Sequence, residues 1–359
     1  MYGLDTLVTN IISFIKLDMK VTKHISTPEV AQALRIDFSS SDFANLDSKK
    51  IDSICQHIKS RIDFTEYQRE VWDNPLFYNS RDTKPNRSQF FAIGNAINFR
   101  YWKLGPEGII SLKGKKGGKE FGGAEYMWRS LSVCLERKQY PLLEASFLAN
   151  ITEVQFNSIF STDYGEDLFA VGKEDRLNNL RDLGSKLASK WDGSFFNVVN
   201  EANSSLIDFC HLSREFIAFD DPIYKLTMVN AIIHSGSSVA QFDADPLPGI
   251  DYQLLKQLLR IGILHPLGNI ESKLRNQEIL TSEEAYELRR SALHCFVIIS
   301  GKTKISGEIL DNKFWMNRKK CRDINPVCLV RETASDCPFW GVCDRQISFK
   351  IPLEMTRYY

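Results

Sequence analysis

Apolar residues recur every three or four positions along much of the chain. In residues 44–60 and 173–191, isoleucine and leucine recur at this spacing with polar and charged residues between them. Such spacing is typical of helices that bury one face. The pattern continues in three further stretches, residues 196–211, 252–262 and 283–300. It therefore predicts a mainly α-helical protein.

Two stretches favour β structure instead. Residues 90–102 and 109–113 are rich in aromatic and β-branched side chains, and we expect them to form a short sheet or hairpin. The segment KGKKGGK, Lys113–Lys119, is basic and glycine-rich, which is typical of a solvated turn. The sequence thus predicts a helical protein with a small β element.

The chain divides into three regions by the motifs it carries. Residues 1–85 show no motif, and we expect them to pack as helices on the core. Residues 86–310 form the expected core, and residues 311–359 form a cysteine-rich C-terminal segment. At 359 residues, the chain is long enough for one large domain or two ordinary ones.

The charge balance argues against a protein that holds long nucleic acid. Lys and Arg number 45, and Asp and Glu also number 45, so the net charge is zero. Binding through many phosphates usually needs a basic excess, so we expect a small ligand or a short nucleic-acid segment. The sequence has no apolar run of about 18 residues, the length of a membrane span. Residues 1–20 lack the pattern of a secretory signal, and we expect a cytoplasmic protein.

Four cysteines lie close together near the C-terminal end, spaced C-x6-C-x8-C-x5-C. They are Cys321, Cys328, Cys337 and Cys343. The other cysteines stand singly among apolar residues, where thiols usually pack as small hydrophobic groups. Four clustered thiolates can supply all the ligands of a zinc ion or an iron–sulfur cluster. In a chain of this size the clustering favours a metal over disulfides.

Asp251 stands where a proline-rich turn meets an amphipathic helix. Pro246 and Pro248 forbid regular helix, and Gly249 permits a tight turn. One interpretation is a helix N-cap, whose carboxylate accepts backbone N–H groups of the first turn. The other is catalytic, because a rigid carboxylate in a pocket stabilises the positive charge on a sugar C1′ while a glycosidic bond breaks. The residues alone leave both interpretations open.

Several segments, in the same order, resemble the queuosine salvage proteins, the queuosine 5′-phosphate N-glycosylases. DYQLLKQLLRIGIL at 251–264 resembles the family's D-Y-R-L-P-Q-x-L-x-x-L-G-x-L stretch. NAINFRYW at 95–102 resembles its L-N-F-x-F-W stretch, and Tyr224-Lys225 is similar to its F-Y-K-R motif. Further similar segments are residues 122–137, 144–163, 174–176 and 187–199. No single piece is specific, and the resemblance rests on their shared order over about residues 90–300.

The resemblance implies a helix-hairpin-helix DNA-glycosylase-like fold and an N-glycosidase activity. The expected substrate is a modified nucleotide, queuosine 5′-phosphate, cleaved to queuine and ribose 5-phosphate in queuosine salvage, which serves tRNA modification. Asp251 would be the catalytic carboxylate. The expected substrate-binding residues are Lys225 at the sugar-phosphate, Tyr252, Phe99 and Trp102 at the base, and Arg176. For Phe99 a place in the core, and for Arg176 a structural salt bridge, are the alternatives.

The cysteine-rich segment resembles, in part, a loop of the endonuclease-III-type DNA glycosylases. That loop holds a [4Fe-4S] cluster with the spacing C-x6-C-x2-C-x5-C. This chain shares the two outer spacings and the Cys337-Pro338 pair, but its middle spacing is eight residues. The resemblance implies a [4Fe-4S] cluster, with zinc as the alternative. In either case we expect a structural role, because all four thiolates serve as ligands.

Two other functions stay open. A DNA base-excision glycosylase would use the same carboxylate on a flipped base, whereas a non-catalytic, metal-stabilised binding protein would not need it. Asp243 and Asp245 either protonate the leaving base or are solvated turn residues. The chain lacks the phosphate-loop, G-x-S-x-G and H-E-x-x-H motifs, which weighs against a phosphate-loop hydrolase, an esterase and a zinc protease.

Overall fold

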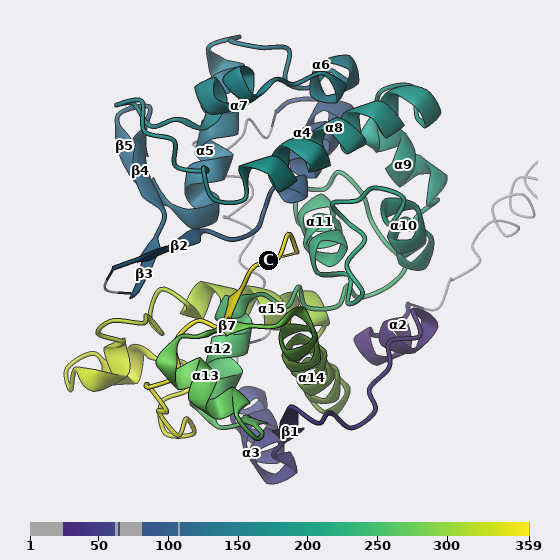
Figure 1. The fold of residues 1–359 in the computed structure, drawn as a ribbon. Helices are drawn as coiled ribbons and strands as arrows, with labels where there is room; N and C mark the ends of the chain where they lie inside the picture. Colours follow the sequence, from purple (N-terminus) through teal and green to yellow (C-terminus); the bar gives the residue numbers. More distant parts are fainter. Residues whose placement is uncertain (1–23, 62–63, 65–80, 107, 359) are drawn as a thin grey trace, which may run out of the picture.

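Helices dominate the computed structural model, which describes residues 24–61, 64, 81–106 and 108–358 (Figure 1). The α-helices are α2 (Thr27–Ala33), α3 (Ser48–Lys59), α4 (Lys84–Ala96), α5 (Gly123–Glu136), α6 (Ala145–Ala149), α7 (Glu153–Phe160), α8 (Lys173–Lys190), α9 (Phe195–Glu201), α10 (Leu206–Ser213), α11 (Lys225–Gly236), α12 (Tyr252–Ile261), α13 (Ile270–Asn276), α14 (Ser282–Thr303) and α15 (Gly307–Asn317). Two short 3-10 helices, η3 (Val327–Leu329) and η4 (Ala334–Asp336), follow. The predicted mainly α class is confirmed, while the helix-hairpin-helix relationship stays a prediction.

Within the described residues the strands pair only in twos, as expected for a small β element. Antiparallel pairs join β1 (Ala44–Leu46) to β6 (Leu264–Pro266), β2 (Trp102–Gly105) to β3 (Gly108–Ser111), and β4 (Lys113–Lys116) to β5 (Lys119–Gly122). A parallel pair joins β7 (Ile279–Leu280) to β8 (Leu353–Glu354), which brings the C-terminal segment back onto the helical core.

Three of the predicted helices, α8, α12 and α14, lie almost where the apolar spacing placed them. Residues 196–211 form two helices, α9 and α10, instead of one. The break falls at Asn203 and Ser204, whose φ angles of 48° and 65° are left-handed and cannot continue a helix. Residues 44–60 likewise begin as strand β1 before Asp47 caps α3 by accepting the backbone N–H of Lys50 at 2.9 Å.

The strand predicted over residues 90–102 is wrong for most of that range. Residues 84–96 form α4, which begins after the N-cap Thr83. All residues from 87 to 96 are buried, so its aromatic and β-branched side chains pack in the core on every side. Burial of this kind overrides strand propensity. Only β2, starting at Trp102, forms the expected hairpin with β3.

The basic segment Lys113–Lys119 does contain the predicted turn. Gly117 and Gly118, with φ angles of 61° and 80°, connect β4 to β5. The carboxylate of Asp163 accepts both of their backbone N–H groups, at 3.1 and 2.8 Å. The hairpin is thereby fastened to the loop that follows α7.

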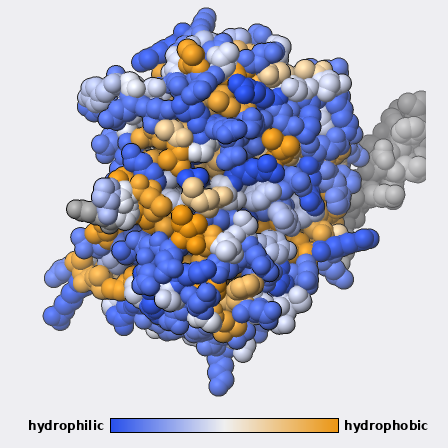
Figure 2. Space-filling view, in the orientation of Figure 1, coloured by the Kyte–Doolittle hydropathy of each residue, from blue (hydrophilic) through white to orange (hydrophobic). Residues whose placement is uncertain are grey.

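Two groups of helices face each other across the middle of the molecule (Figure 1). Helices α4 to α11 form the upper group, and α12 to α15 form the lower group together with α2 and α3. Helix α15 crosses the region boundary predicted at residue 310. On the face shown in Figure 2, apolar side chains gather along the seam between the two groups. In the described part of the chain, no helix combines the length and apolarity needed to cross a bilayer.

Candidate active site

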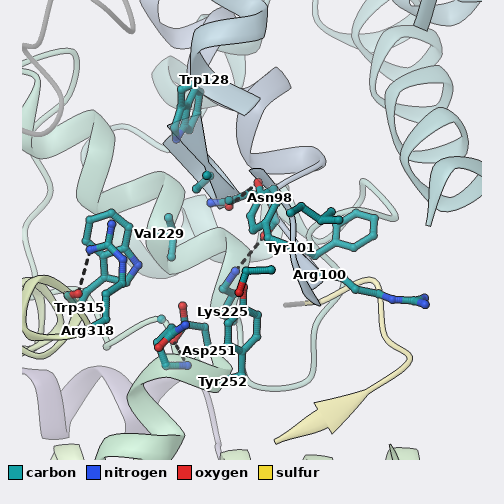
Figure 3. A pocket seen from close by; sticks show the side chains of 18 of the residues that line it. Asn98, Arg100, Tyr101, Trp128, Lys225, Val229, Asp251, Tyr252, Trp315 and Arg318 are labelled. Carbon is teal, nitrogen blue, oxygen red and sulfur yellow. Dashed lines mark hydrogen bonds between the residues drawn. The ribbon is translucent and has the colours of Figure 1, made fainter. Parts of the chain in front are cut away.

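A cavity of about 250 Å³, the central cavity, opens between the two groups of helices (Figure 3). Residues of α11, α12 and α15 line it, together with the segment before β2 and the start of α5. Its size is close to the lower end of typical ligand pockets. Two acids and four bases stand in its wall: Asp251, Asp311, Arg100, Lys113, Lys225 and Arg318.

Asp251 is both the N-cap of α12 and part of the wall of the central cavity. Its Oδ1 accepts the backbone N–H groups of Gln253 at 2.8 Å and Leu254 at 2.9 Å. Both bonds end on one oxygen, so Oδ2 is the oxygen available to a ligand. The capping interpretation is confirmed. Capping is also compatible with the catalytic interpretation, because it holds the carboxylate rigidly and the helix dipole favours its charged form.

Lys225 begins α11 and points into the central cavity close to Asp251 (Figure 3). Its side chain is buried, and Nζ donates a hydrogen bond to the backbone carbonyl of Asn98 at 3.0 Å. Burial lowers the pKa of Lys225 to about 8, while the charge of Asp251 opposes that change. Lys225 is therefore mostly a cation at neutral pH, placed beside a carboxylate.

A buried ion pair behind the cavity fixes the positions of Lys225 and Asp251. Asp221 is fully buried and binds Arg289 of α14 through two hydrogen bonds, at 2.6 and 3.2 Å. Its Oδ2 also accepts the backbone N–H of Lys225 at 2.8 Å. Arg289 donates to the carbonyl of Ile250, the residue before Asp251, at 3.5 Å. One polar network thus joins α11, α14 and the turn that leads into α12.

Asp311 of α15 is a second carboxyl group in the cavity wall and was absent from the predicted site. Its Oδ1 accepts the backbone N–H of Gly249 at 2.9 Å. Burial raises the pKa of Asp311 to about 7, and the nearby charge of Asp251 adds to the rise. Such a group is partly protonated near neutral pH and can donate a proton. The sequence did contain a signal for this group of residues. The i, i+4 and i+7 spacing of Asp311, Trp315 and Arg318 places them on one face of a helix.

Trp315 and Arg318 form one side of the central cavity (Figure 3). The guanidinium of Arg318 stacks on the indole, with Cζ 3.2 Å from the ring centroid, and Nη1 donates to the carbonyl of Trp315 at 2.9 Å. Nη2 reaches the carboxylate of Glu125 at 3.4 Å. The pair offers an aromatic face and a fixed cation side by side, which suits a flat base or an anionic group.

Of the aromatic residues predicted to hold a base, Phe99 and Tyr252 line the central cavity. Tyr101 lines it as well, and its hydroxyl donates to Oδ1 of Asn98 at 3.0 Å. Trp102 is not in the wall. It packs behind Tyr252 in a small cluster with two residues of the C-terminal segment, because successive residues at the start of a strand face opposite sides.

Arg176 is fully buried and lies outside the cavity wall. It donates to the backbone carbonyls of Val171 at 2.7 Å and Phe99, and its guanidinium lies 4.3 Å from the ring centroid of Phe99. Its partners are thus carbonyls and a ring rather than the carboxylate of a salt bridge. Arg176 braces the segment that carries Phe99.

Asp243 and Asp245 also lie outside the cavity wall. Asp243 accepts the backbone N–H of Leu206 at 3.1 Å, and Asp245 pairs with His24 at 2.8 Å. These contacts agree with the interpretation of both acids as turn residues. Asp311, by contrast, lines the central cavity.

The four clustered cysteines line a second cavity, of about 30 Å³, beside Arg260 near the end of α12. They are partly exposed, whereas the other four cysteines are buried. Among the residues that the structure describes, no three His, Cys, Asp or Glu side chains are arranged as a metal-binding group. The predicted cluster or zinc ion therefore stays a prediction.

Comparison with known proteins adds an independent line of evidence. The profile of the queuosine salvage protein family matches residues 78–231. This region of the chain is therefore similar to that family. Two similar proteins are both named queuosine 5′-phosphate N-glycosylase/hydrolase. The one from Sphaerobacter thermophilus is 24% identical over 241 residues, which is 62% of this chain and 71% of the relative. The one from Bos taurus is 23% identical over 254 residues, which is 65% and 72%.

The profile of the queuosine salvage family covers Phe99, Arg176 and Lys225 but ends before Asp251. The similarity to the family therefore does not depend on Asp251. The inclusion of Asp251 in the candidate site rests on the geometry of the central cavity, which both Lys225 from the matched region and Asp251 from outside it line.

Proposed function

We propose that this protein is a queuosine salvage N-glycosidase that hydrolyses queuosine 5′-phosphate to queuine and ribose 5-phosphate. One observation carries the proposal. A rigidly capped carboxylate, Asp251, lines the central cavity beside the buried ammonium of Lys225. The activity named for both relatives supports the choice of substrate.

The reaction needs a negative charge at C1′ and a proton for the departing base. As the C1′–N bond breaks, its electron pair leaves with the base and positive charge builds on the sugar. Asp251 stabilises that charge, either by bonding to C1′ or by orienting a water. Asp311 donates a proton to the base, because its raised pKa keeps it partly protonated. Water then gives its hydroxyl to C1′, and its released proton restores Asp311.

The remaining wall residues divide the substrate between them. Tyr101, Tyr252 and Trp315 offer aromatic faces to the deazapurine base. Lys225 and Arg318 supply fixed cations for the sugar-phosphate half. The central cavity thus has groups of suitable chemistry for both halves of a nucleotide.

Asp251→Asn gives the sharpest test, because asparagine caps helices about as well as aspartate and the variant should stay folded. Purified wild-type protein should release queuine from queuosine 5′-phosphate, measured by chromatography. The variant should turn over at least about 10³-fold more slowly. Asp243→Asn, outside the cavity, is the matched control and should keep the wild-type rate.

The outcomes separate the alternatives. A binding protein would show no turnover in the wild type and equal ligand affinity in Asp251→Asn. A DNA glycosylase would excise bases from damaged duplex with a steep salt dependence and leave the free nucleotide intact. Either result would overturn the proposal.

A further inference from the structure

The cysteine-rich segment brings all four of its thiols to one small cavity. Cys321, Cys328, Cys337 and Cys343 line a space of about 30 Å³ together with Arg260. The smallest cavities that hold one water measure about 10–15 Å³, so this space is large enough for a single ion. The chain around it has two 3-10 helices and otherwise little regular structure until β8. A metal centre would crosslink a segment of this kind and stabilise its fold.

The charges around the four thiols are complementary to an anionic centre. Arg260 and Lys256, both on α12, are only 2% and 1% exposed. Asp323 lies 3.4 Å from each of them and is half-buried. Lys320 and Arg345 add two more cations to the cavity wall. A centre with four thiolates carries a net charge of about −2 with either Zn²⁺ or a [4Fe-4S] cluster, and these cations would compensate it.

Two of the sulfur atoms already accept hydrogen bonds from N–H groups. The backbone N–H of Arg345 donates to Sγ of Cys343 at 3.3 Å, and Nη1 of Arg260 donates to Sγ of Cys321 at 3.5 Å. Hydrogen bonds of this kind orient and stabilise sulfur in its charged, metal-binding form.

We propose that Cys321, Cys328, Cys337 and Cys343 bind one metal centre through their four thiolates. The centre is either Zn²⁺ or an iron–sulfur cluster, and both demand the same set of soft sulfur ligands. The described residues hold no group already arranged for a metal, so the four sulfur atoms draw together around the small cavity when it binds. All four ligand positions are filled by the chain, which makes the role structural rather than catalytic.

The centre fastens the two helices that carry the acids of the central cavity. The backbone N–H of Asp344, next to Cys343, donates to the carbonyl of Ile261 at the end of α12 at 3.2 Å. The backbone N–H of Cys321 donates to the carbonyl of Asn317 at the end of α15 at 2.8 Å. Asn317 in turn donates to Gln257 of α12 at 2.8 Å. Metal binding should therefore hold the C-terminal ends of α12 and α15 together.

Metal analysis of the full chain, purified without oxygen, tests the proposal. We expect either about one zinc or about four irons per chain, and only iron should give a brown protein with absorption near roughly 400 nm. Cys328→Ala and Cys337→Ala should each lose most of the metal. Cys134→Ala, which removes a buried thiol far from the segment in sequence, is the matched control and should keep it.

A second measurement on the wild type guards against variants that fail to fold. Titration with a mercurial should release the metal in proportion to the thiols modified, and the stripped protein should unfold at least about 5 °C lower. Less than a tenth of an equivalent of zinc and iron in protein with freely titrating thiols would overturn the proposal, and so would two disulfides among the four cysteines. Queuine release is measured on the same samples, so failure of the metal proposal stays distinct from failure of the glycosidase.

Discussion

Replacing Asp311 with asparagine tests the proton donor, and the structure fixes the size and sign of two effects. Asparagine keeps the shape and can still accept the N–H of Gly249, but it has no acidic proton. The pKa of Asp311 is raised from 3.8 to about 7 by burial and by Asp251. At about 1.4 kcal/mol for each pH unit, this difference corresponds to roughly 4 kcal/mol. It is the extra free energy needed to ionise the carboxyl group in the folded protein compared with the unfolded chain.

The stability effect has a definite pH window. Because the pKa is raised in the folded state, the folded protein binds more protons than the unfolded chain between about pH 4 and pH 7. The contribution of Asp311 to stability therefore falls as the pH rises through this window. Asp311→Asn escapes the loss. We expect it to be more stable than the wild type by up to about 4 kcal/mol at pH 8 and nearly equal to it at pH 4.

The catalytic effect has the opposite direction. Turnover of queuosine 5′-phosphate by Asp311→Asn should fall by about 10²–10⁴-fold. The wild-type rate should decline above about pH 7 as Asp311 ionises, and in the variant the decline should begin only above about pH 8, where Lys225 deprotonates. Urea unfolding at pH 4 and pH 8, with queuine release on the same samples, measures both effects, and Asp243→Asn serves as control. The reasoning would be refuted if the variant turned over substrate at the wild-type rate. It would also be refuted if the stability of the variant differed from that of the wild type by the same amount at pH 4 and at pH 8.

Three further predictions concern the neighbours of these acids. Lys225→Met should lower kcat/KM by roughly 100-fold and remove the further loss of activity expected in the wild type as Lys225 deprotonates above about pH 8, while the decline due to Asp311 remains; an unchanged pH profile above pH 8 would contradict this. Trp315→Ala should raise KM about 10-fold or more while kcat changes little, since stacking on one base is worth about 1–3 kcal/mol; an unaltered KM would rule out base stacking there. Asp221→Asn should lower the free energy of unfolding by about 3–5 kcal/mol in urea titrations, because it removes the carboxylate charge that is paired with the buried guanidinium of Arg289; a loss below about 1 kcal/mol would count against a stabilising role of this ion pair.

Helices with a regular apolar spacing could be predicted from local sequence patterns. Features that depend on tertiary contacts could not. The leucine spacing of α8 and α12 and the capped start at Asp251 depend on neighbours along the chain, so they could be predicted from the sequence. Helix α4 could not, because its apolar residues are buried on all sides and have no amphipathic period. Asp311 escaped notice because its raised pKa arises from burial beside Asp251, which lies on another helix.

Similarity to a family also does not show which side chains line the cavity. Lys225 and Arg176 both lie in segments that resemble the queuosine salvage proteins, yet only Lys225 lines the central cavity. The carbonyls that surround Arg176 come from segments far from it in sequence as well as near it. No short motif distinguishes a side chain that faces a ligand from one that supports the wall behind it.

Asp251 caps a helix and is also the proposed catalytic residue, and this combination has a practical consequence for studying the reaction. One of its oxygens secures the first turn of α12, which leaves the other oxygen for a ligand in the central cavity that Asp251 lines. An amide in its place preserves the former task while abolishing the latter. Crystals of the inactive Asp251→Asn variant, soaked with intact nucleotide, should trap the uncleaved complex. They should show how the protein binds its substrate before the bond is broken.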